Sequence, residues 1–133
     1  MNRRRFYALV LAACVLIGCA ANDGPKRFRI SGEAKFDGQP IVHGDVLFTP
    51  DGAKGNSGPQ GIAQIRNGKY DTAADGKGVA GGPTVVRVTG LTGPGGKLVC
   101  EYEMKLDLPR ADSTQNIDVP KKAAAKSSNK PEI

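Results

Sequence analysis

The chain has few aromatic residues and a single histidine. Its 133 residues include no tryptophan, three tyrosines and four phenylalanines, so any apolar core it builds is modest. A protein metal centre needs at least three converging ligands, and His43 is one imidazole. The same imidazole would have to serve every serine, and no serine lies in the G-x-S-x-G turn of the hydrolases. A serine hydrolase is therefore not expected.

No apolar run in the chain is long enough for a comfortable membrane span. The longest run, residues 6–17, has twelve residues, whereas a membrane-spanning helix needs roughly 20. Three consecutive arginines precede it and small residues close it. A positive segment followed by a short apolar one is typical of a secretory signal peptide. We therefore expect residues 1–18 to be a signal peptide that is absent from the mature chain.

The apolar run ends on Leu16-Ile17-Gly18-Cys19, which resembles the lipobox of bacterial lipoproteins. In that family the cysteine thiol receives a diacylglyceryl group, the chain is cut before it, and the new amino terminus is acylated. The resemblance implies lipid attachment at Cys19, with the membrane as a partner. Two or three acyl chains make a stable anchor, because each buried methylene contributes ~0.8 kcal/mol and one chain holds only marginally. A plain secretory signal is the alternative.

The residue after Cys19 is Ala20 rather than aspartate. In the lipoprotein family this resembles the arrangement that is passed on to the outer membrane. The expected location is therefore outside the cytoplasm, anchored on the outer membrane or the periplasmic side of the cell envelope. Residues 19–27 would tether the domain to the lipid.

Cysteine is also scarce. Cys14 lies in the expected signal peptide and Cys19 in the lipobox, so Cys100 has no partner within one mature chain. No intramolecular disulfide framework is expected.

The net charge of +6 is not distributed over the expected domain. Three of the nineteen basic residues lie in the signal segment and four in residues 121–133, which also hold one of the thirteen acidic residues. Residues 19–120 thus carry twelve charges of each sign, and the basicity does not indicate nucleic-acid binding. The segment 121–133, KKAAAKSSNKPEI, is too polar to offset the entropy of ordering, and we expect it to be disordered.

The first half of the region between tether and tail shows strand patterns. Apolar and polar residues alternate over residues 28–36 and again over residues 41–50, which is the period of a half-buried strand. Two further strands, 61–66 and 69–72, flank Asn67-Gly68, a strong hairpin signal because a type I′ turn needs positive φ at both positions.

The second half continues in the same way. Residues 84–89 are rich in valine and threonine, which favour strands. Residues 98–108 alternate most clearly, and residues 114–119 predict a last strand. Seven short strands without a convincing helical period predict an all-β fold, a small seven-stranded antiparallel β-sandwich over residues 28–120.

The segments Asp37-Gly38-Gln39-Pro40, Gly44-Asp45-Val46-Leu47-Phe48-Thr49-Pro50 and Asn67-Gly68-Lys69-Tyr70 resemble the transthyretin-like, carboxypeptidase-regulatory-type domain. The resemblance covers about residues 28–119 and implies an immunoglobulin-like sandwich that binds or has a structural role, with no catalytic residues. Thr84 departs from it, because the family usually has a tyrosine there.

Five other residues can be weighed for chemistry. His43 and Asp45 share a strand face, but that face offers no third metal ligand, so a surface polar pair is the favoured interpretation. Cys100 falls in the inward series of its strand and is expected to be a buried apolar residue rather than a nucleophile. Asp71 and Asp75 could help to hold calcium, yet their spacing fits no EF-hand, and turn-forming aspartates are favoured.

We therefore expect no enzyme activity, no cofactor and no metal. The leading hypothesis is a lipid-anchored domain that binds an envelope protein, a glycan or another copy through its loops or a sheet edge. Residues 50–59 and 73–83 are the loops expected to bind. The alternative is a structural spacer or a self-assembling envelope subunit.

Overall fold

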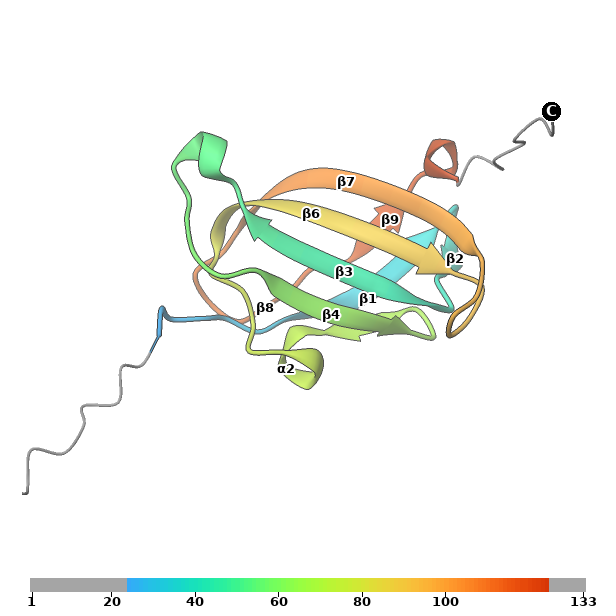
Figure 1. The fold of residues 1–133 in the computed structure, drawn as a ribbon, viewed down its shortest axis with the longest axis horizontal. Helices are drawn as coiled ribbons and strands as arrows, with labels where there is room; N and C mark the ends of the chain where they lie inside the picture. Colours follow the sequence, from blue (N-terminus) through green and yellow to red (C-terminus); the bar gives the residue numbers. More distant parts are fainter. Residues whose placement is uncertain (1–23, 125–133) are drawn as a thin grey trace, which may run out of the picture.

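Alternating apolar and polar residues keep most of the chain extended. In the computed structural model, which describes residues 24–124, the strands join in one curled sheet (Figure 1). The nine strands of this part of the chain are β1 Ile30–Phe36, β2 Gln39–Pro40, β3 His43–Pro50, β4 Gly61–Arg66, β5 Lys69–Asp71, β6 Gly82–Leu91, β7 Leu98–Leu108, β8 Ser113–Thr114 and β9 Ile117–Val119. A short helix, α2 Thr72–Asp75, and two 3-10 turns, η1 Gly52–Lys54 and η2 Lys121–Ala123, lie between or after them.

The sheet follows the order β2-β1-β5-β4-β3-β6-β7, and every neighbouring pair in this path is antiparallel. β4 and β5 pair only at Arg66 and Lys69, beside the hairpin turn. The sheet diverges at this corner, so β1 lies behind β3 and β6 (Figure 1). The predicted all-β, sandwich-like fold is confirmed.

The hairpin predicted at Asn67-Gly68 is present. Asn67 has φ 51° and Gly68 has φ 76°, as a type I′ turn requires. Asp37 and Gly38 form the same kind of turn between β1 and β2, with φ values of 49° and 77°.

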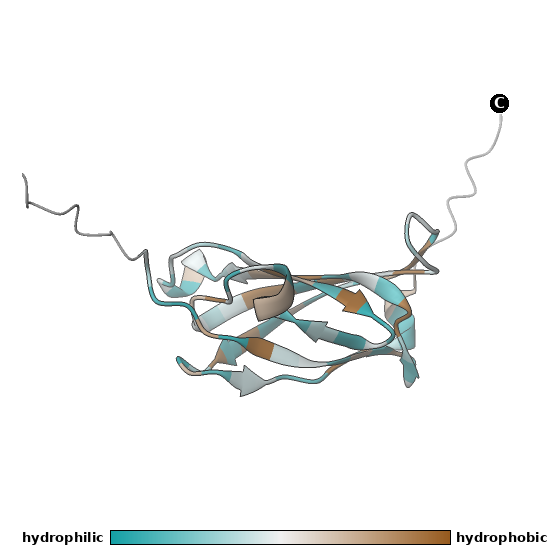
Figure 2. Cartoon of the chain, turned by 90° about the horizontal axis from the view of Figure 1, so that it is seen from below, coloured by the Kyte–Doolittle hydropathy of each residue, from teal (hydrophilic) through white to brown (hydrophobic). Residues whose placement is uncertain are grey.

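The core lies inside the curl and is built from every second residue of the strands. Figure 2 shows hydrophilic and hydrophobic segments alternating along the strands. Phe48 and Tyr70 pack with ring centroids 6.1 Å apart. The largest fully buried residues are Phe48, Ile30, Ile65, Val46, Val86, Val88, Val119, Thr72 and Cys100.

The prediction of one antiparallel strand over residues 114–119 is wrong in two respects, because the strand is interrupted and its pairing is parallel. The structure has two short strands, β8 and β9, and both pair with β1 in parallel. The chain leaves the extended ladder at Gln115 and Asn116, where the Gln115 carbonyl accepts a hydrogen bond from the Tyr70 hydroxyl and the Asn116 side chain accepts one from the Glu33 amide. Contacts with distant residues interrupt this strand.

The expected strand 69–72 ends one residue early. Thr72 is fully buried and begins α2, and its Oγ1 accepts a hydrogen bond from the Ile30 amide at 2.9 Å. One hydroxyl thus joins the helix start to β1.

The tail begins later than expected. Residues 121–123 form η2, Ala123 packs against the core, and Ala124 forms an antiparallel bridge with Cys100. The ordered domain therefore extends beyond Pro120. The remaining tail residues, 125–133, lie outside the described residues, as do the signal segment 1–18 and the tether up to residue 23. Within residues 24–124, no helix has the length and apolar character to cross a membrane.

Candidate functional site

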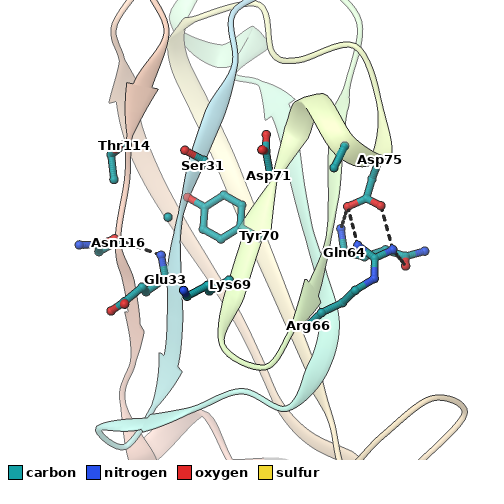
Figure 3. A pocket seen from close by; sticks show the side chains of 12 residues that line it. Ser31, Glu33, Gln64, Arg66, Lys69, Tyr70, Asp71, Asp75, Thr114 and Asn116 are labelled. Carbon is teal, nitrogen blue, oxygen red and sulfur yellow. Dashed lines mark hydrogen bonds and ion pairs between the residues drawn. The ribbon is translucent and has the colours of Figure 1, made fainter.

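An open groove lies on the outer face of the β1-β5-β4 part of the sheet (Figure 3). Its volume is about 670 Å³. Because residues alternate between the two faces of a strand, the groove receives polar residues whose neighbours form the core, and the core residue Tyr70 also reaches it. The lining residues are Ser31, Gly32, Glu33, Gln64, Arg66, Lys69, Tyr70, Asp71, Ala74, Asp75, Thr114 and Asn116.

One side of the groove is held by an ion pair between Asp75 and Arg66. Arg66 Nη2 lies 2.9 Å from Asp75 Oδ1, and Asp75 Oδ2 accepts a hydrogen bond from the Gln64 amide at 2.8 Å (Figure 3). Hydrogen bonding from the Arg66 guanidinium, and then from the Gln64 amide, lowers the pKa of the Asp75 carboxyl. Asp75 therefore stays ionised and fastens α2 to β4.

A second ion pair lies at the other end of α2. Arg29 Nε donates to Asp71 Oδ1 at 3.0 Å and Arg29 Nη2 lies 2.5 Å from Asp71 Oδ2, which makes the pair bidentate. Asp71 also caps the helix, because its Oδ1 accepts from the Ala73 amide at 2.9 Å. The Arg29 guanidinium is the main cause that lowers the pKa of Asp71.

The floor of the groove depends on a missing side chain. Gly32 leaves open the space beside Tyr70, and a Cβ at Gly32 would lie 2.1 Å from the Gln115 carbonyl oxygen. The Tyr70 hydroxyl donates to that same oxygen at 2.5 Å. Burial raises the pKa of the Tyr70 phenol, so it remains a neutral donor. The tyrosine thus bonds β5 to the segment between β8 and β9.

The groove offers both donors and acceptors with nearly balanced charge. Its walls carry three carboxylates, Glu33, Asp71 and Asp75, and two cations, Arg66 and Lys69. Asp71 and Asp75 are engaged by arginines, whereas Lys69 forms no ion pair within residues 24–124. No histidine or cysteine lines the groove in this part of the chain. The arrangement suits a polar partner recognised by hydrogen bonds and one free cation.

His43 and Asp45 lie on β3 and do not line the groove, although they pair with Arg66 and Gln64, which do. His43 is half-buried, opposite Arg66 on β4 and Leu91 on β6. No hydrogen bond joins its side chain to Asp45 among the described residues. In residues 24–124, no three His, Cys, Asp or Glu side chains come together in a way that could hold a metal ion.

Cys100 is in the core, as predicted. It is fully buried, and desolvation raises the pKa of its thiol. The groove and this thiol are therefore separate features. The neighbouring inward residues of β7 differ from the prediction of a buried row, because Tyr102, Met104 and Leu106 are only half-buried and Leu98 is 44% exposed.

The two loops expected to bind lie together, but they contribute unequally. Asn56 Nδ2 donates to the carbonyls of Gly81 and Pro83 at 2.9 and 2.7 Å, which joins the loop 50–59 to the loop 73–83. Only Ala74 and Asp75 of these loops line the groove. Asp71 and Asp75, considered above as calcium ligands or turn residues, instead cap and fasten α2.

Sequence reasoning missed most of the groove, including Ser31, Glu33, Gln64, Arg66 and Lys69. Each is an outward residue of an alternating strand, and the alternation says only that it faces solvent. The available signal was the hairpin at Asn67-Gly68, which brings Arg66 and Lys69 opposite each other. Cys19, the predicted lipid attachment site, lies outside the described residues.

Comparison of the chain with protein-family models gave no match, and a search of curated proteins found no significant relative.

Proposed function

We propose that the chain is a lipid-anchored protein of the bacterial cell envelope whose β-sandwich domain binds a polar partner without catalysing a reaction. The anchor would be an acylated Cys19, and the partner an envelope protein or a glycan. The lipobox-like segment Leu16-Ile17-Gly18-Cys19 supports the anchor. The transthyretin-like pattern in the sequence is consistent with a binding role.

The groove is the observation that carries the binding proposal. It is open, its walls are held in place by two arginine–carboxylate pairs, and Lys69 is left available. Preorganised polar side chains lose less entropy when a partner binds. A glycan or a polar peptide segment fits this pattern of donors and acceptors.

Cross-linking in the native envelope tests the binding proposal. A photoreactive residue replaces Lys69 in the full chain, and a matched control replaces Lys54, an exposed lysine of the expected loop. We expect mass spectrometry to find one species captured reproducibly at position 69 and absent at position 54. Capture at position 54 alone would show that the loop 50–59, and not the groove, binds the partner. No capture above that of a Cys19→Ala control would contradict the binding role.

Fatty-acid labelling tests the anchor separately. We expect the full chain to incorporate label, Cys19→Ala to lose it, and Cys14→Ala to keep it. Label that persists in Cys19→Ala would contradict the proposed attachment site.

The structural role is the second candidate, and one observation favours it. The path of the sheet ends at β7, a strand of eleven residues with an open outer edge in the described part of the chain.

A further inference from the structure

The outer edge of β7 is the longest open stretch of backbone in the described sheet. β7 pairs with β6 along its whole length, while on its other side, within residues 24–124, it pairs only with Ala124, at Cys100. The segment 101–107 therefore presents unpaired N–H and C=O groups, which form a template for another strand.

The side chains of this segment show strict alternation. Tyr102, Met104 and Leu106 face inward, are half-buried and pack against the edge of the core. The outward residues are charged and exposed: Glu101, Glu103, Lys105 and Asp107. The inward side chains of an added strand would pack beside Tyr102, Met104 and Leu106 and bury them further. Its outward side chains would lie next to the charged residues of β7.

We propose that a second copy of this chain pairs with the segment 101–107 of β7 in an antiparallel arrangement, with the two-fold axis at Met104. The two copies would form one continuous sheet through an isologous interface. This inference is independent of the partner bound in the groove.

Symmetry and charge select the register. Inward residues must lie opposite inward residues, so the axis has to pass through a residue position. An axis at Met104 sets Glu103 opposite Lys105 of the second copy, twice, and sets Tyr102 opposite Leu106. Opposite charges and apolar side chains in directly facing positions stabilise a strand pair.

The adjacent registers are less favourable. An axis at Glu103 sets Glu101 opposite Lys105, but it also sets the Glu103 carboxylate opposite its own copy. Leu106 would then face Cys100, whose edge Ala124 occupies, so the paired segment shortens to residues 101–105. An axis at Lys105 sets lysine opposite lysine and Glu103 opposite Asp107. Like charges in facing positions destabilise the pair.

The selected register contains one unfavourable pair. Glu101 lies opposite Asp107 of the second copy at both ends. This repulsion and the short paired segment predict a weak, concentration-dependent dimer. Asp107→Lys should therefore tighten the dimer, because it places a lysine opposite Glu101.

The interface and the groove occupy different parts of the sheet. The groove lies on β1, β5 and β4, and β3 and β6 separate these strands from β7. Pairing at β7 leaves both grooves open. Loss of the dimer and loss of cross-linking at Lys69 are therefore separate outcomes.

Charge exchange tests the register in the full chain, purified in detergent and measured by analytical ultracentrifugation. We expect Glu103→Lys and Lys105→Glu each to weaken self-association about tenfold or more. The double variant should regain most of it. Within one chain, Glu103 pairs with Arg87 at 3.0 Å and Lys105 lies 3.7 Å from Asp51. The double variant cannot restore these intramolecular pairs, so its recovery reports contacts between copies.

Disulfide trapping tests the axis in the envelope. Met104→Cys would place two thiols in directly facing positions, where the Cα separation of about 4.5–5.5 Å suits a disulfide. Oxidation should give a covalent dimer of Met104→Cys, and none above background in the unsubstituted chain or in Ile62→Cys, whose exposed residue lies on the inner strand β4. Equal yields at positions 62 and 104, a double charge variant as weak as the single ones, or a monomer at all concentrations would each overturn the proposal.

Discussion

β1 and β7 belong to the same sheet, yet they are enclosed differently. β1 pairs with β5 and β2 along one edge and with β8 and β9 along the other. β7 pairs with β6, and within the described residues its other edge meets only Ala124. Where neighbouring backbone encloses a strand on both sides, a single added side-chain atom can clash with it. Where an edge is open, side chains decide what the strand can meet.

Gly32→Ala should have the largest effect. The added Cβ would lie 2.1 Å from the Gln115 carbonyl oxygen, which belongs to backbone and cannot turn away. We expect the free energy of unfolding to fall by about 3 kcal/mol, measured by thermal and denaturant melts at low protein concentration.

Gly93→Ala is the matched control, because nothing lies within 4 Å of its Cβ position. Its stability should change by less than about 0.5 kcal/mol. Equal melting temperatures for the two variants would show that β1 is less tightly enclosed than we describe.

Tyr70→Phe should have the next largest effect. It removes the hydroxyl that bonds β5 to the Gln115 carbonyl and leaves that acceptor with one fewer partner. We expect a loss of about 1–2 kcal/mol in the free energy of unfolding.

The corresponding change on the open edge is Tyr102→Phe. Tyr102 is half-buried, and its hydroxyl makes no hydrogen bond within the described residues. The change should be close to neutral for the monomer. A larger loss at position 102 than at position 70 would contradict the contrast between the two strands.

Acid should weaken the groove through Asp75. The pKa of Asp75 is lowered in the folded chain, chiefly by Arg66. Its contribution to stability is therefore complete above its unfolded pKa of about 4, and is lost as the pH falls through the lower, folded value. Asp75→Asn should flatten the loss of stability in melts below pH 4. An unchanged pH profile would show that the ion pair with Arg66 does not stabilise the fold.

Glu103→Lys should have only a small effect on the stability of the monomer. Both side chains of the Arg87–Glu103 pair are about half exposed, at 53% and 51%, and such pairs contribute about 0.2–1 kcal/mol. A small shift in the melting temperature, together with a clear loss of self-association, would separate the role of β7 in folding from its role in contact between copies.

Local patterns predicted the strands well, because alternation and turn chemistry act over a few residues. The alternation of residues 98–108 located β7, and Asn67-Gly68 located the hairpin. The same patterns failed at residues 114–119, where a hydroxyl from β5 and an amide from β1 capture Gln115 and Asn116. Those partners are 45 and 83 residues away in the chain, beyond the reach of any local rule.

The sequence alone therefore establishes the all-β class, most strand positions, the hairpin turn and the burial of Cys100. All of these follow from side-chain period and backbone preference within a short window. The groove, α2, the parallel pairing of β8 and β9, and the open edge of β7 depend on which strands become neighbours. Which strands become neighbours follows from packing across the whole chain. The local sequence around an outward residue does not show which residues of other strands will lie beside it.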